Sequence, residues 1–235
     1  ENRYSGIWVG RGAVVTDGYA YLEMSRVQAN NNTYDGVRVG TGAKCVTGTA
    51  VTSLLDITAF NNGGTGLYIG RGAAVSQGEA YLTVANVSAV SNQYYGIRVW
   101  SGAVVTDGYA YLEMSGVEAN NNMWDGVSVD TGAQCVTGTA ATYLRGITAF
   151  NNGGNGLDIG CGAAVSQGDA HLSLENVSTV SNHRYGVQIY NGAIAGTGEA
   201  QAVLNDLTCN ENRYSGIWVG RGAVVTDGYA YLEMS

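Results

Sequence analysis

Apolar and polar residues alternate in short segments along this chain. In the first thirty residues, every second residue is apolar in segments 7–9, 13–15, 20–24 and 27–29. A period of two is typical of a β-strand with one buried face. The inward residues are mostly small or β-branched, which suits strands stacked around a narrow core. No apolar pattern of helical spacing persists for three turns, so the pattern predicts an all-β protein.

Segments rich in Gly or Asn separate these strands. In the first thirty-two residues they are 10–12, 16–18 and 30–32. We expect a corner at each segment, because Gly and Asn both tolerate the backbone conformations that turns require. The chain contains no Pro, which agrees with strands that need every backbone amide for pairing.

The whole pattern returns every 30 residues without insertion or deletion. Residues 211–235 are identical to residues 1–25, an offset of 210, and residues 102–115 repeat residues 12–25 at an offset of 90. Coils one to three resemble coils four to six, and coil seven diverges, which defines a 210-residue super-repeat. We therefore predict one continuous stack over residues 1–235. Its coils are 1–30, 31–60, 61–90, 91–120, 121–150, 151–180, 181–210 and the incomplete 211–235.

Several positions hold the same residue in every coil, among them Gly12, Ala13, Gly18 and Ala20 and their equivalents, and two further positions bear directly on the fold. The second position is Asn2, Asn32, Asn62, Asn92, Asn122, Asn152, Asn182 and Asn212. The sixth position is Gly6, Gly36, Gly66, Gly96, Gly126, Gly156, Gly186 and Gly216. An inward Asn repeated in each coil can bond to the Asn above, the Asn below and the turn backbone, so we predict an asparagine ladder. The Gly column predicts corners that need positive φ or leave no room for a Cβ atom.

A single coil cannot bury its own inward face, whereas stacked coils pair each strand with its copy at about 4.8 Å. The prediction is a parallel β-solenoid of about eight coils. Residues 92–99, Asn-Gln-Tyr-Tyr-Gly-Ile-Arg-Val, resemble the repeat of right-handed parallel β-helix proteins (the PbH1-like repeat). The resemblance extends over the whole chain and implies a right-handed coil and a tandem-repeat fibre that is secreted or held at the cell surface. The chain departs from that family in its longer coil and its lack of long loops.

The two end coils have the same sequence and carry no helix, Pro or charged capping strand. Solenoids that exist as separate molecules protect their end coils. We therefore expect an uncapped segment of a longer tandem array. The alternative is a short subunit that stacks end to end, and both interpretations give a fibre.

The charge of the chain narrows the range of partners. The formal net charge is −8, and the 11 basic residues form no cluster. Nucleic acid binding needs clustered Lys and Arg, and so does binding to an anionic membrane surface, so we expect neither. No segment approaches the roughly 20 apolar residues of a membrane-spanning helix, so no membrane insertion is expected.

The best candidates for catalytic carboxylates are Asp125, Asp130 and Asp158. Coil spacing places Asp130 and Asp158 roughly 8 Å apart, a separation used by some inverting glycosidases. Pectin-active members of the resembled family also place Lys or Arg beside their carboxylates. No Lys or Arg column accompanies these residues and no long loop builds a cleft, so we predict solvated carboxylates, no catalytic residues and no enzyme activity.

Metal and cofactor sites are not expected. Asp17, Asp107 and Asp227 share a column but are separated by three or more coils, and His171 and His183 lie in different columns. Calcium needs six to eight oxygen ligands around one point, which this spacing does not provide.

The four cysteines are predicted to be free thiols. Cys45 and Cys135 share an inward column three coils apart, too far for a disulfide, and Cys209 lies in another inward column. Cys161 falls at a corner, where we expect an exposed thiol.

Outward aromatic residues are frequent and suggest a contact surface. Tyr19, Tyr21, Tyr109, Tyr111 and Trp8 are candidates for lateral packing between fibres or for binding glycans. The alternative is that stacked Tyr side chains only protect the outer sheet. Separately, Asn-x-Ser/Thr triplets make Asn31, Asn86 and Asn176 possible glycosylation sites.

These features predict a structural repeat segment of an extracellular filament, a sheath or a giant cell-surface adhesin stalk. Its main partner is expected to be itself, with glycans as a second partner. A carbohydrate-binding or carbohydrate-active β-helix protein is the first alternative. An ice-binding solenoid is the second, although the column at Thr16 is small and β-branched without a regular Thr array.

Overall fold

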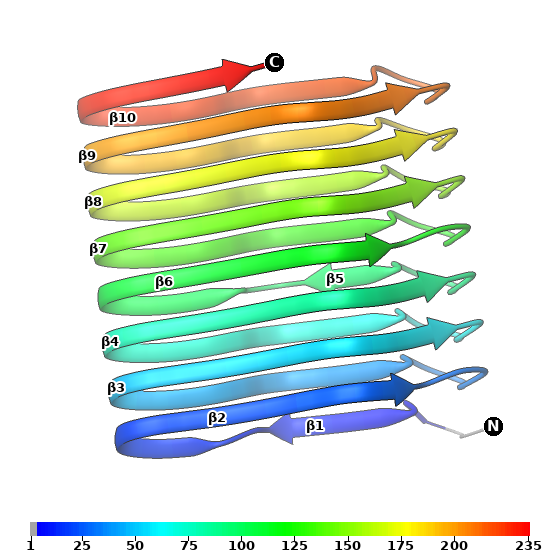
Figure 1. The fold of residues 1–235 in the computed structure, drawn as a ribbon, viewed down its shortest axis with the longest axis horizontal. Coiled ribbons are helices and arrows are strands. Elements are labelled where there is room, and N and C mark those ends of the chain that lie inside the picture. Colours follow the sequence, from blue (N-terminus) through cyan, green and yellow to red (C-terminus); the bar gives the residue numbers. More distant parts are fainter. Residues whose placement is uncertain (1–3) are drawn as a thin grey trace.

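The computed structural model describes residues 4–235 and is a parallel β-solenoid (Figure 1). The chain runs from left to right across the front, returns behind in the opposite direction, and climbs from the N-terminus to the C-terminus. That sense of rotation makes the coil right-handed. No helix occurs within residues 4–235, so the described part contains no helical membrane span.

Every strand pairs in parallel with the strand one coil away, at an offset of 30 residues. The register runs from Ile7 opposite Val37 to Leu204 opposite Met234 without a slip. The strands are β1 (Ile7–Arg11), β2 (Val14–Gln28), β3 (Val37–Phe60), β4 (Leu67–Val90), β5 (Ile97–Val99), β6 (Ala103–Glu118), β7 (Val127–Phe150), β8 (Leu157–Val180), β9 (Val187–Asn210) and β10 (Ile217–Met234). The predicted all-β solenoid with 30-residue coils is confirmed.

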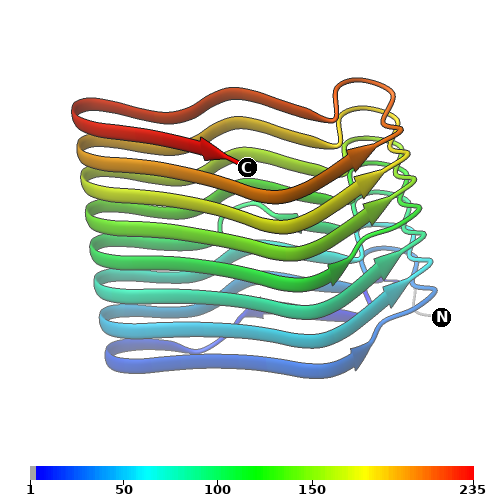
Figure 2. The ribbon, with the colours of Figure 1, turned by 45° about the horizontal axis from the view of Figure 1, so that its top comes forward.

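Most strands are longer than the sequence predicted. The expected corners at positions 10–12 and 16–18 do not end the pairing, and β3 alone continues for 24 residues. Pairing breaks at the first of these corners only in coils one and four, after Arg11 and after Val99. All coils bend at the same place, so stacked backbones stay in hydrogen-bonding register through the bend (Figure 2).

The bend at positions 16–18 depends on glycine. Gly108 has a φ of +135°, and a Cβ atom there would lie 2.0 Å from the carbonyl oxygen of Gly78. The left-handed conformation and the close backbone approach both exclude other residues. At the sixth position glycine is required by the close backbone approach alone. A Cβ at Gly36 would lie 2.7 Å from the Gly66 carbonyl oxygen.

Two groups of side chains fill the interior. Leu, Ile and Val side chains such as Leu54, Ile69 and Leu112 form one cluster and are fully buried. Small residues of the columns that contain Ala20 and Cys45 form the other, on either side of the bend at positions 16–18. The alternation seen in the sequence therefore marks the buried face, and residue size follows the width available inside the coil.

The asparagine ladder runs through the described part of the stack, from Asn32 to Asn212, while Asn2 lies outside the described residues. Asn92 illustrates its geometry. The Asn92 Oδ1 atom accepts from the side chain of Asn62 at 2.9 Å and from its backbone amide at 3.1 Å. The Asn92 Nδ2 atom donates to Asn122 Oδ1 at 3.1 Å and to the Ala59 carbonyl at 3.1 Å. Each buried amide is thus satisfied by its copies and by the backbone.

At two further positions residues other than glycine adopt positive φ, which the sequence analysis did not identify. One is the residue before the ladder, as in Asn61 and Asn151. The other is the twenty-sixth position of the coil, as in Arg26 and Asp56. Asn tolerates this conformation because its short polar side chain bonds locally, and Asn61 Nδ2 donates to Asn31 Oδ1 at 2.9 Å.

Replacing Asn92 by Ala is expected to destabilise the solenoid by about 2–4 kcal/mol, because four hydrogen bonds end on this side chain. Urea unfolding followed by circular dichroism measures the loss. Gln93→Ala is the matched control, since the exposed neighbour lies at the same corner and should change stability by less than about 0.5 kcal/mol. Equal effects of the two substitutions would show that the ladder adds no stability.

Candidate functional site

A cavity of about 380 Å³ opens at the corner between β7 and β8, where coils five and six are joined. This row of corners lies at the right-hand edge of the stack in Figure 1. The fourth position of the coil is aromatic at most corners, for example Tyr94 and Trp124. Coil six instead has Gly153 and Gly154, which leaves the space between Trp124 below and Arg184 above. We call this space the corner notch. Tyr95, Met123 and Asp125 complete its lining.

Asp125 is the carboxylate of the corner notch, and its position explains the glycine above it. Asp125 Oδ1 accepts the backbone amide of Asn155 at 2.5 Å. A Cβ atom on Gly154 would lie 2.1 Å from that oxygen. The same pair recurs three coils earlier, where a Cβ on Gly64 would lie 2.5 Å from Asp35 Oδ1. An aspartate at the fifth position therefore requires glycine at the fourth position of the next coil.

The two related corners differ in how their carboxylates are neutralised. Asp35 forms an ion pair with Arg38 at 2.8 Å. The residue that corresponds to Arg38 beside Asp125 is Ser128, and Asp125 has no ion pair within 4 Å among the described residues. Burial raises the pKa of Asp125, while the Asn155 amide and the charges of Arg184 and Arg98 lower it.

A polar network continues from the corner notch onto β8. Asn155 Nδ2 donates to Asp158 Oδ1 at 3.0 Å and to Gln188 Oε1 at 2.9 Å. Burial, together with the charges of Asp125 and Asp130, raises the pKa of Asp158 to about 7. At neutral pH this carboxyl group is therefore close to half protonated.

The sequence analysis was wrong about the surroundings of these aspartates. It expected solvated carboxylates without an accompanying cation, but Arg98 donates to Asp130 Oδ2 from Nε at 3.1 Å and from Nη2 at 2.9 Å. The same guanidinium lies 4.7 Å from the ring centre of Tyr95. Asp158 is only partly exposed. The cation was missed because Arg98 belongs to the column of Asp158 and reaches diagonally to a different column one coil away.

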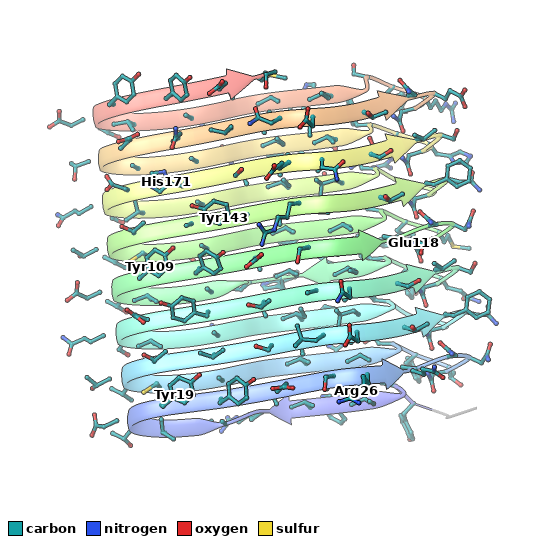
Figure 3. All side chains as sticks on the ribbon, viewed as in Figure 1. Tyr19, Arg26, Tyr109, Glu118, Tyr143 and His171 are labelled. Carbon is teal, nitrogen blue, oxygen red and sulfur yellow. The ribbon has the colours of Figure 1, made fainter. Side chains whose placement is uncertain are left out.

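The predicted tyrosine surface lies on the front face of the stack (Figure 3). Tyr109 and Tyr111 stack with ring centres 6.0 Å apart, and Tyr111 lies 5.5 Å from Tyr143. Burial and a nearby glutamate raise the pKa of Tyr81 and of Tyr111 to about 12, so these hydroxyl groups remain protonated donors. Tyr109 and Tyr111 therefore pack along β6, and Tyr111 also packs across to Tyr143 on β7.

Tyr19 lies on the same face and is 60% exposed (Figure 3). It stacks with Tyr21, with ring centres 6.1 Å apart. Trp8 does not join them, because it lies on β1 behind β2. Lateral contact between fibres remains a prediction for these residues.

The three possible glycosylation sites are exposed and have positive φ. They are Asn31 at 57°, Asn86 at 55° and Asn176 at 51°. Asn86 Nδ2 donates to Asp56 Oδ1 at 3.1 Å. Glycosylation of these residues remains a prediction.

The cysteines are free thiols, as predicted, but two differ from the expected burial: Cys161, and Cys209, which is only partly buried although its column points inward. Cys45 and Cys135 are buried. The expectation of an exposed Cys161 is wrong, because this side chain is partly buried and burial raises the pKa of its thiol to about 11. Within residues 4–235 no group of three or more His, Cys, Asp or Glu side chains could hold a metal ion.

Comparison with known proteins gives no match: no family model, curated sequence or solved structure is similar to this chain. The fold therefore defines the class of protein, a right-handed parallel β-solenoid with 30-residue coils.

The pairing of Asp125 with Gly154 predicts a specific energetic coupling. Gly154→Ala should destabilise the solenoid by about 1–3 kcal/mol, because the new methyl group displaces the carboxylate from the Asn155 amide. In Asp125→Ser the shorter side chain makes room, so the double variant should lose less stability than the sum of the two single variants. A double-mutant cycle from urea unfolding measures this. Strict additivity would contradict the steric explanation.

The raised pKa of Asp158 predicts how stability depends on pH. The group titrates at about 7 in the folded protein and at its ordinary value of 3.8 when unfolded. The folded state therefore holds an additional proton between these values, and stability falls as the pH rises through this interval. Asp158→Asn should flatten this slope and stabilise the protein by about 1 kcal/mol at pH 8, allowing for partial exposure.

Urea unfolding at pH 4 to 8 measures the slope. Gln93→Ala, which changes an exposed uncharged side chain, is the control and should leave the slope as it is. An unchanged slope in Asp158→Asn would refute the assignment.

Proposed function

We propose that this chain is a structural repeat segment of an extracellular filament, a sheath or a giant cell-surface adhesin stalk. The observation that supports the proposal most is the unbroken 30-residue register of the backbone ladder from Ile7 to Met234. Rows of hydrogen bonds along the axis resist bending and leave no flexible joint within the stack. The proposed action is therefore mechanical, a stiff rod that holds surfaces apart or together.

Continuation of the rod is supported by the identity of residues 1–25 and 211–235. The first coil pairs with the second through contacts such as Trp8 opposite Arg38 and Val15 opposite Cys45. The last coil has the same sequence as the first. Its upper edge therefore offers the same donors and acceptors to a further coil that resembles the second. The proposed partner is accordingly a further 210-residue unit, as part of the same chain or as a second copy.

The location outside the cell is proposed from the resemblance of the repeat to those of secreted and surface β-helix proteins. The net charge of −8 supports it, because like-charged rods repel one another and remain dispersed.

A lengthened chain tests the mechanical proposal. If residues 26–235 are repeated once after Ser235, the rod should lengthen by about 34 Å, the rise of seven coils, without a change in cross-section. Small-angle X-ray scattering measures both dimensions. The matched control repeats residues 31–235 instead, which shortens the joining coil by five residues and should produce a joint or a loss of stability. Two independently moving halves in the in-register chain would contradict the proposal.

Immunogold electron microscopy tests the proposed location. Antibodies raised against this chain should label long external fibres of uniform width on intact source cells. Label confined to the interior of permeabilised cells would refute an extracellular role.

A further inference from the structure

We propose that the corner notch is a binding site for a neutral sugar ring of a glycan. This inference is independent of the filament proposal, because it rests on one cavity and on side chains that differ from those of the related corner. A stalk and a glycan-binding site can coexist on one solenoid.

One wall of the corner notch is apolar. The rings of Tyr95 and Trp124 meet edge to face with centres 5.2 Å apart. Trp124 is 46% exposed and Met123 is 64% exposed, although both are large apolar side chains. Sugar rings present C–H groups on their faces that pack on such surfaces, and the amphipathic Trp ring is suited to a contact that is partly wet.

The other notable side chains of the notch, Asp125 and Arg184, carry opposite charges. They do not form an ion pair with each other within 4 Å. Asp125 uses Oδ1 for the Asn155 amide, which leaves Oδ2 as an acceptor. The Arg184 guanidinium lines the opposite side and forms no ion pair within 4 Å among residues 4–235. A sugar hydroxyl group both donates and accepts hydrogen bonds, so adjacent hydroxyl groups can satisfy a carboxylate and a guanidinium together.

The related corner three coils earlier also borders a cavity, of about 240 Å³, but its charged side chains are arranged differently. There Arg38 neutralises Asp35 at 2.8 Å, and the aromatic Tyr94 stands at the position of Arg184. The corner notch therefore lacks the counterion that Asp35 has, and it carries a guanidinium where the related corner carries an aromatic ring, although the Asp and Gly pair that shapes the backbone is the same. These differences change what the corner can bind and leave the fold intact.

The size and the charge of the notch narrow the ligand class. Its volume of about 380 Å³ lies within the roughly 300–1,000 Å³ of small-ligand sites. Asp125 and Arg184 line the notch, and Asp130, Asp158 and Arg98 lie close enough to interact electrostatically with its charges, so the region has no excess positive charge. A neutral sugar is favoured over a uronic acid for this reason.

The probes for this proposal are cellotriose, maltotriose, chitotriose, galactotriose and, as an acidic arm, trigalacturonate. Each is titrated to about 20 mM against the ¹⁵N-labelled chain, and the Trp124 indole and the Gly153 and Gly154 amides are followed by NMR. At least one neutral trisaccharide should shift these signals with a dissociation constant on the order of 1 mM. Trp124→Ala and Arg184→Gln should each weaken that binding by about tenfold or more.

The matched control is Tyr34→Ala, which removes an aromatic side chain at the same corner position three coils below Trp124 and should leave the affinity unchanged. The dispersion of the remaining amide signals verifies that each variant is folded. The proposal is overturned if no neutral trisaccharide shifts the notch signals, if binding survives both substitutions, or if trigalacturonate alone binds.

Discussion

The structure depends on one constraint, that each strand residue pairs with the residue 30 positions away in the next coil. Every coil must therefore turn at the same places and place the same kinds of side chains inside. This requirement explains why Gly108 and Gly78 stack where their backbones approach each other, and why Asn92 meets copies of itself above and below. The rows of 30 residues contain no insertion or deletion that would interrupt this pairing.

Most of the fold could be predicted because repetition makes register visible in the sequence. Identical residues at an offset of 30 identify the coil, and alternation identifies its buried face. The continuity of the strands could not be predicted in the same way. Segments such as 40–42 have turn composition, and only the stacking of identical bends keeps them paired inside β3.

The candidate site was harder to predict, because it arises where the repeat departs from itself. The sequence analysis grouped Asp125 with Asp130 and Asp158, yet the signal that mattered was its combination with Gly154 in the next coil, which recurs as Asp35 with Gly64. Comparison of each residue with the neighbouring column of the next coil could have revealed this Asp–Gly combination. The ion pair between Arg98 and Asp130 also crosses columns, so column-by-column reading missed it. The solenoid thus fixes the arrangement of the backbone, and differences between coils at the corners determine which side chains are available for binding.

The most direct test of the account measures distances along the axis between equivalent positions. Replacement of the native cysteines by residues found in the same columns allows spin labels to be placed at Glu79 and Glu199, four coils apart, and at Tyr19 and Glu199, six coils apart. Pulsed electron paramagnetic resonance should give separations of about 19 Å and about 29 Å, in proportion to the number of coils. Equal separations, or distances unrelated to the number of coils, would contradict a stack of 30-residue rungs.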